Sequence, residues 1–285
     1  MQYNQFARSL ATAALDQQRR LRDACWGLSN EITSYAKQAN ATWPFVFLPY
    51  FESYGKGFFA HSHAEFIGVQ NIVKDEDRDA FINWTTAHFK EWLEESHMIQ
   101  YGHLDFLNTD PAKYNEYIAR RDKEKTFPPD DERPFYAVRV VQSPPMRAYG
   151  PTMNLNIATI PGIADMHAAL FALKNETIVT KVKPFDAVPP EEHQNFHTDS
   201  EADNPHSFLY TPIWRDVQDP ESGIVGSLSS SVAWDASMLN LLPKTVRGID
   251  CVVYNNCGQT LPTGCPDLMP TFKVTETITI LNLTT

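Results

Sequence analysis

FLYTPIWRDVQDPESGIVGSLSSSVAW, residues 208–234, is the stretch that decides the fold. Its first seven residues are mostly aromatic or apolar, which favours a half-buried β-strand. Residues 215–223 contain three acidic side chains, a proline and a glycine, and this composition predicts a turn exposed to water. Residues 224–234 form a second run, which contains Gly226 and four serines, so the stretch predicts an antiparallel β-hairpin. Because Pro212 has no N–H to donate to a neighbouring strand, we expect it at a sheet edge or a bulge.

The composition is that of an ordinary globular protein with an acidic surface. The chain has 285 residues, enough for one large domain or two small ones with a full core. Its net charge of −11 argues against a nucleic-acid partner, because binding phosphates requires clustered Lys and Arg. The same charge argues against docking on anionic lipid. No run of 18 apolar residues occurs, so no membrane span is expected within the chain, and residues 1–14 lack the apolar core of a signal peptide.

Residues 5–42 predict one long helix. Apolar side chains recur there at steps of three and four residues, which places them on one helical stripe. They are Ala7, Leu10, Ala14, Leu21, Cys25, Leu28, Ile32 and Tyr35. A helix of this length is well above the mean for globular proteins. Two roles remain open for it: a spine packed along the body of the protein, or a stalk that pairs with a second copy.

The rest of the chain alternates between strand and helix patterns. Strands are expected at residues 43–51, 64–73, 135–141, 178–182 and 248–254, helices at 79–95 and 162–173, and a glycine-containing loop at 53–60. The acidic loop at residues 189–204 is the best candidate for a boundary between two modules.

A pair of histidines makes one candidate metal site. In an extended chain His61 and His63 point to the same side, and Glu52 or Glu65 would complete a zinc site with them. The simpler interpretation is a histidine-rich loop, and we expect no metal here.

No other motif in the sequence points to catalysis. His193 and His197 have the i, i+4 spacing of zinc hydrolases, but no glutamate follows His193 as that motif requires. The Gly-x-Ser-x-Gly elbow, the P-loop and the Gly-x-Gly-x-x-Gly loop are absent, as are the motifs of a cyclase catalytic domain. We therefore expect that this chain is not itself an enzyme and that it carries no cofactor.

The cysteines and glycosylation sequons bear on the compartment. Cys25 lies in the predicted long helix, where it is expected to be a small buried apolar residue. One disulfide is expected among Cys251, Cys257 and Cys265 in an oxidising compartment. Asn-x-Ser/Thr sequons, which accept glycans on a secretory route, occur at Asn40, Asn83, Asn175 and Asn282.

Several stretches resemble a known family. Residues 175–185, NETIVTKVKPF, resemble the "TGK-x-x-LT-x-PF" strand of CHASE domains, the ligand-sensing ectodomains of receptor histidine kinases and nucleotide cyclases. The 208–234 hairpin resembles the final hairpin of a PAS-like extracellular sensor module. WPFVFLPYFE at 43–52, PIW at 212–214 and NLLP…GI at 240–249 are similar, in this order, to the ectodomains of receptor-type guanylate and adenylate cyclases of single-celled algae. The resemblance covers residues 6–260 and fails after Leu261.

The resemblance implies an α+β fold of CHASE or double-Cache type. Residues 1–42 would form a stalk or spine helix packed on two PAS-like antiparallel sheets. Residues 43–190 would form the membrane-distal module, and residues 191–285 the membrane-proximal module with an atypical C-terminus. The implied function is ligand sensing on the outer side of the cell membrane, by a receptor whose cyclase domain lies outside this chain.

The resemblance also implies where the ligand binds and what the partners are. The ligand would lie against residues 136–149, 153–158 and 178–184, with Arg147, Tyr149, Asn154 and Thr180 as binding residues, and Arg147 is suited to pairing a carboxylate or phosphate. The expected partners are an unidentified small molecule and a second copy that pairs through the N-terminal helix. The membrane would be reached only through flanking helices outside this chain. A stand-alone secreted ligand-binding protein and a metal-dependent hydrolase remain the alternatives.

Overall fold

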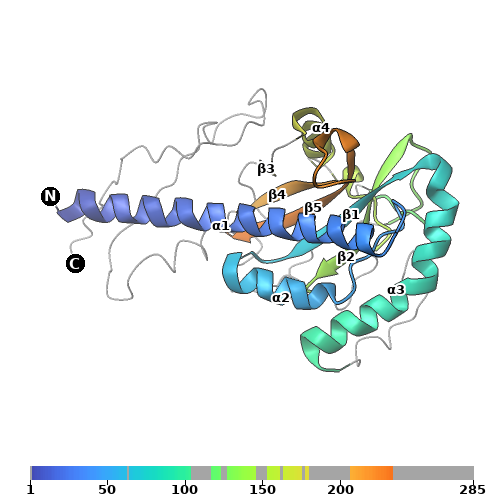
Figure 1. The fold of residues 1–285 in the computed structure, drawn as a ribbon, viewed down its shortest axis with the longest axis horizontal. Coiled ribbons are helices and arrows are strands. Elements are labelled where there is room, and N and C mark those ends of the chain that lie inside the picture. The colour runs from blue at the N-terminus through green and yellow to red at the C-terminus, as the bar shows by residue number, and fades with distance from the viewer. Residues whose placement is uncertain are drawn as a thin grey trace.

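A five-stranded antiparallel sheet forms the centre of the computed structural model (Figure 1). Its strand order is β2-β1-β5-β4-β3. The strands are β1 (Ile67–Lys74), β2 (Phe135–Ser143), β3 (Ile178–Val179), β4 (His206–Trp214) and β5 (Ile224–Ala233). The structure describes residues 2–62, 64–103, 117–122, 127–145, 153–160, 163–174, 177–179 and 206–233. With helices on both faces, the fold is of the α+β class, as expected.

The predicted hairpin is confirmed as β4 and β5, which pair along their whole length. Pro212 occupies the kind of position expected for it. The pairing of β3 with β4 stops at Tyr210, so Pro212 lies beyond the end of β3, and the ladder with β5 is irregular between Ile213 and Trp214. The described part of β3 makes no pairing with Pro212 that would need an N–H.

The predicted long helix is α1 (Gln2–Gln38). Its C-terminal half buries Leu21, Cys25, Leu28, Ile32 and Ala36, whose spacing keeps them on one stripe. The N-terminal half extends beyond the sheet (Figure 1). α1 is therefore a spine over part of its length, and its projecting part leaves the stalk role open.

The sequence prediction is wrong for residues 43–60. The expected strand at 43–51 has no strand pairing, and the expected loop at 53–60 lies within α2 (Phe51–Ser62). The Asn71 side chain donates to the carbonyls of Pro44 and Val46, at 2.8 and 2.9 Å, in place of a strand ladder. Gly55 is needed for close packing rather than for a turn, since a Cβ there would lie 2.1 Å from Ser143 Oγ.

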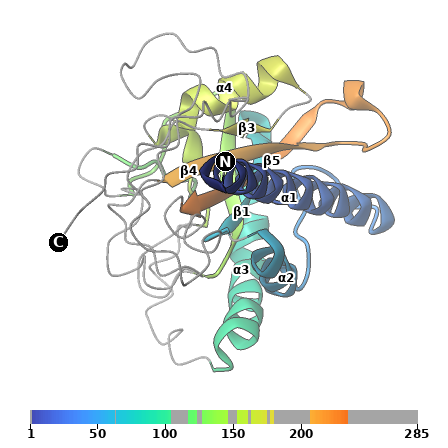
Figure 2. The same cartoon turned by 90° about the vertical axis from the view of Figure 1, so that its left-hand side faces the viewer.

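Two further helices complete the described fold. α3 (Arg78–Tyr101) is the helix expected at 79–95, and α4 (Ile163–Leu173) is the one expected at 162–173. Figure 2 shows α4 on the opposite side of the sheet from α2 and α3. On the side of β2 away from β1, Arg139 exchanges backbone hydrogen bonds with Asn154 and Leu155, and Val138 forms an isolated bridge with Asn156.

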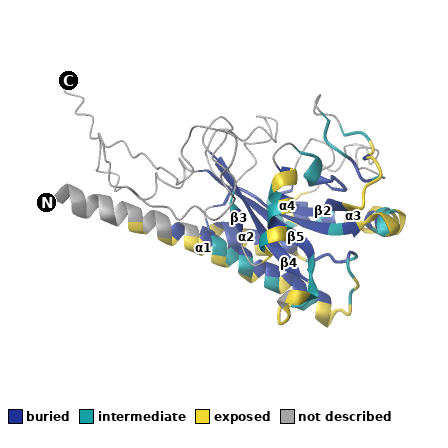
Figure 3. Ribbon diagram, turned by 90° about the horizontal axis from the view of Figure 1, so that it is seen from above, coloured by how far each residue is buried: buried dark blue, intermediate teal, exposed yellow. Residues whose placement is uncertain are grey.

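The two faces of the sheet differ in chemistry. α1, α2 and α3 cover a face made of apolar strand residues, which include Ile67, Val69, Val140, Leu209 and Leu228. α4 covers the other face, where a smaller apolar cluster is interrupted by polar side chains. The strands between these layers are almost wholly buried, whereas α1 and α3 have exposed outer sides (Figure 3).

The expected module boundary at residues 190 and 191 falls within this sheet. β1, β2 and β3 precede it, β4 and β5 follow it, and β1 pairs directly with β5. In the described part of the chain, strands from both expected modules therefore form one sheet. A long acidic connection between neighbouring strands has the same composition as a linker between modules, so composition does not distinguish the two. Residues 234–285, with the expected strand at 248–254, lie outside the described residues.

Among the described helices, none combines the length and the hydropathy that crossing a bilayer requires.

Candidate ligand-binding site

Polar side chains gather on the sheet face that α4 covers. Ser227 and Ser229 of β5 alternate with Leu228, so their hydroxyls lie on this face while the leucine joins the apolar core on the other. Gln70 of β1 and Arg139 of β2 occupy paired positions on the same face. All of these side chains are buried.

Arg139 reaches across the neighbouring strand. Its guanidinium lies against Gly68, where an added Cβ would lie 3.2 Å from Cζ and Nε. Beyond β1, Arg139 Nη2 donates to Ser229 Oγ at 3.3 Å, and Nη1 donates to Gln142 Oε1. Gln70 Nε2 donates to the same serine oxygen at 2.9 Å. The glycine thus opens a path for the arginine into the centre of this face.

The Arg139 cation has no acidic partner among the described residues. Its Nε has no hydrogen-bond acceptor there, and the side chain is only 8% exposed. Burial lowers the pKa of Arg139 to about 10, so the group still carries its charge at neutral pH. The Phe66 ring, with its centroid 5.6 Å from Cζ, offers a weak cation–π contact. A buried cation without a counter-charge lowers the stability of the folded chain, because the charge loses its hydration.

Two neutral polar rings lie farther along the same face. His167 of α4 is 3% exposed, and neither ring nitrogen has a described hydrogen-bond partner. Burial lowers its pKa to about 4, so the imidazole is neutral at pH 7. Its ring centroid lies 5.7 Å from that of Tyr210, and burial raises the pKa of the Tyr210 hydroxyl well above its usual range. We call Gln70, Arg139, His167, Tyr210 and Ser229 the sheet-face site.

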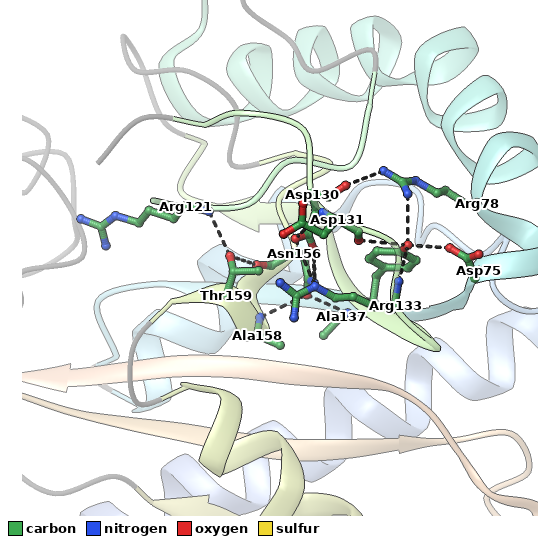
Figure 4. Close-up of polar contacts among 11 residues, drawn as sticks. Asp75, Arg78, Arg121, Asp130, Asp131, Arg133, Ala137, Asn156, Ala158 and Thr159 are labelled. Atoms are coloured by element: carbon green, nitrogen blue, oxygen red, sulfur yellow. Dashed lines mark hydrogen bonds and ion pairs between the residues drawn. The ribbon is translucent and has the colours of Figure 1, made fainter. Parts of the chain in front are cut away.

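A second polar cluster is saturated, in contrast. Just before the start of β2, the buried Asp130 carboxylate accepts from Arg133 Nε at 3.0 and 3.1 Å and from Asn156 Nδ2 at 2.7 Å (Figure 4). Tyr136 donates to Asp75 Oδ1 at 2.6 Å and accepts from Arg78. Because opposite charges and complementary donors meet here, this cluster fastens β2 to the start of α3 and needs no further ligand.

A glutamate, a histidine and a serine also meet in the described core. Glu65 Oε2 lies 3.0 Å from His206 Nε2, and Ser231 Oγ donates to the same oxygen at 3.1 Å. In a hydrolytic triad the histidine lies between the serine and the acid. Here the acid lies between the other two, so the three groups do not have the order of a triad.

Of the four predicted ligand-binding residues, Asn154 lies in the described part of the chain, and its role in binding stays a prediction. Asn154 is buried beside Arg139, with which it shares a backbone hydrogen bond, and its amide donates to Thr85 Oγ1 of α3 at 2.8 Å. Arg147, Tyr149 and Thr180 lie outside the described residues.

The predicted modification sites can be placed only in part. Asn40 and Asn83 are exposed, Cys25 is buried as a free thiol, and Asn175, Asn282, Cys251, Cys257 and Cys265 lie outside the described residues.

Two of the candidate zinc ligands, Glu52 and His61, lie apart on one helix. His61 ends α2 and Glu52 begins it, which separates them by about 13 Å along the helix axis. The extended conformation expected for this pair of histidines is therefore wrong at His61. His63, His193 and His197 lie outside the described residues, and the rest contain no group of three or more His, Cys, Asp or Glu that could hold a metal ion.

Arg139 was missed as a site residue, although the sequence carries a signal for it. It is the one charged side chain in the strand Tyr136–Val141, whose other residues are apolar. An arginine within a buried strand is rare unless it is paired.

Comparison with models of known protein families finds no match to this chain, and a search of curated proteins finds no relative.

Proposed function

We propose that this chain is a ligand-sensing extracellular domain of CHASE type, the input domain of a membrane receptor-type nucleotide cyclase. The observation that carries the proposal is the sheet-face site, in which, among the described residues, the buried Arg139 has no acidic partner and the buried His167 has no hydrogen-bond partner. Small-molecule sites are apolar regions with a few well-placed polar groups, and perturbed titratable groups mark them. A binding role explains polar groups that the described fold leaves unsatisfied.

The architecture supports a PAS-like assignment. The order β2-β1-β5-β4-β3 in an all-antiparallel sheet is the order of PAS-like sheets, and a long helix precedes it. In such modules the ligand lies on one face of the sheet, under short helices. Here the corresponding face is the one beneath α4, which holds the sheet-face site.

β4 gives a physical route from the site to α1. Tyr210 faces the site, while its neighbours Leu209 and Ile213 pack in the core that α1 covers. Ser29 and Thr33 of α1 donate to the carbonyls of Pro212 and Trp214, at 2.7 and 2.8 Å. A ligand that favours one position of β4 would therefore favour one position of α1.

The ligand-induced shift of α1 would act on a dimer formed through this helix. The N-terminal half of α1 extends beyond the sheet, where it would pair with the same helix of a second copy (Figure 1). Membrane helices flanking this chain would carry the shift to the cyclase. The exposed sequons at Asn40 and Asn83 suit an extracellular position.

Sequencing the complete transcript tests the proposal. We expect apolar helices flanking residues 1 and 260 and a cyclase domain downstream. A transcript that begins at Met1 and stops at Thr285 would overturn the receptor role and favour a secreted binding protein, which would use the same sheet-face site.

A further inference from the structure

We propose that Arg139 binds the carboxylate of a small monoanionic organic acid, which is the ligand of the sheet-face site. The inference rests on the proposed function, because it names the chemistry of the molecule that the sensor would detect. It goes beyond the resemblance, in which Arg139 has no role.

The single positive charge of the sheet-face site favours a ligand with one negative charge. Arg139 is the only formally charged group of the sheet-face site at pH 7, since His167 and Tyr210 are neutral there. None of the described Asp or Glu side chains pairs with it. A carboxylate would balance the cation in a region that excludes water, whereas a dianion such as phosphate would leave a second, uncompensated charge buried.

The free donors of the guanidinium suit a carboxylate. Arginine has five N–H donors in one plane, of which Arg139 uses one toward Gln142 and one toward Ser229. Nε has no acceptor, and each terminal nitrogen keeps a second N–H. Two parallel hydrogen bonds from adjacent nitrogens match the two oxygens of a carboxylate. Gly68 leaves room for the guanidinium itself, because a Cβ there would lie 3.2 Å from Cζ and Nε.

The side chains near Arg139 indicate the chemistry of the rest of the ligand. Phe66 lies beside the guanidinium, and its ring centroid is 6.1 Å from that of Phe208. These rings favour an apolar or aromatic body. His167, with one N–H donor and one bare nitrogen in its neutral form, would meet a polar group at the other end of the ligand.

The experiment compares carboxylates with their neutral amides. The purified chain is titrated with phenylacetate, hexanoate, phenylacetamide and hexanamide, and its thermal denaturation midpoint is followed. We expect the carboxylates to raise the midpoint and the amides to have no effect at the same concentration. Inorganic phosphate is expected to have no effect.

Arg139→Gln tests the residue, and Arg19→Gln on the exposed part of α1 is the charge-matched control. We expect Arg139→Gln to weaken carboxylate binding roughly tenfold or more, since it removes charge-assisted hydrogen bonds, and Arg19→Gln to leave it unchanged. Arg139→Lys should keep the charge but lose the planar pair of donors, and should bind weakly. Unchanged binding by Arg139→Gln would overturn the assignment.

A measurement on the unaltered chain keeps the test independent of variant folding. Carboxylate binding should fall as the pH drops below the ligand's own pKa, because the neutral acid brings no counter-charge. Equal binding of acid and amide would overturn the inference. Stabilisation by neutral compounds or amines alone would overturn it too, yet would leave the sensor proposal standing, which the transcript tests separately.

Discussion

The Arg139 guanidinium crosses β1 at Gly68, where an added Cβ would lie 3.2 Å from both Cζ and Nε. The contact predicts a specific effect of Gly68→Ala. The guanidinium must move by a few tenths of an ångström, which disturbs its donation to Ser229, and overpacking of this kind costs about 1–3 kcal/mol. Urea denaturation should show this loss, and phenylacetate titration should show weaker binding.

Gly57→Ala is the matched control for that substitution. Gly57 lies in α2 with nothing within 4 Å of an added Cβ, so alanine should stabilise the helix by roughly 0.5–1 kcal/mol and leave binding unchanged. Equal effects of the two substitutions would contradict the role given to Gly68.

Arg139→Met should stabilise the ligand-free chain. The substitution removes a buried cation that has no described counter-charge and fills the space with an apolar side chain of similar length. Replacements of buried charges by apolar groups are often stabilising by about 1–4 kcal/mol. The comparison is Arg133→Met, which deprives the buried Asp130 of its partner and should destabilise by about 1–3 kcal/mol. Urea denaturation measures the free energy of unfolding of both variants. Destabilisation by Arg139→Met would assign Arg139 a structural role.

Local patterns predicted several elements of the fold correctly. The β4–β5 hairpin follows from two apolar runs and an acidic turn, and α1 follows from its stripe. The same reasoning failed at residues 43–60, where the decisive contacts are distant. Asn71 holds the 44–46 backbone, and Ser143 requires the glycine at position 55. No local pattern contains these contacts.

The sheet-face site could not be assembled from the sequence for a similar reason. Gly68, Arg139 and Ser229 belong to three strands far apart in the chain, and only the strand order brings them together. An arginine in an apolar strand indicated a candidate site residue. Whether a carboxylate side chain of the protein pairs with it depends on the fold.

Glu52 predicts a pH dependence of stability. Its side chain is fully buried at the start of α2, and burial raises its pKa from 4.5 to about 7, although the nearby Ser143 hydroxyl and the Lys56 charge lower it somewhat. Neither carboxyl oxygen reaches hydrogen-bonding geometry with a described donor, so burial dominates. The folded chain therefore binds more protons than the unfolded chain between these two pH values. The contribution of Glu52 to the free energy of unfolding is fully present below pH 4.5, and it is lost as the pH rises through 7.

The loss attributable to Glu52 should be about 3 kcal/mol, and Glu52→Gln should remove it. The free energy of unfolding is measured for both proteins between pH 4 and 8, because their difference cancels the titration of other groups. Parallel curves would show that the Glu52 carboxyl is solvated in the folded chain.

The hydroxyls of Ser29 and Thr33 should matter more for coupling than for binding. They donate to the Pro212 and Trp214 carbonyls of β4, whereas the sheet-face site lies on the other side of that strand. Ser29→Ala and Thr33→Val should each cost about 1 kcal/mol of stability, because each leaves a buried carbonyl without its donor. Their phenylacetate affinity should stay that of the parent chain. In the cyclase-linked receptor that we propose, the ligand-induced change in cyclic-nucleotide production should shrink in both variants. Ser34→Ala, on the same helix but with no hydrogen bond to the described strands, should keep the full response. A full response in the Ser29 and Thr33 variants, at unchanged ligand affinity, would show that the signal does not pass through the β4–α1 contact.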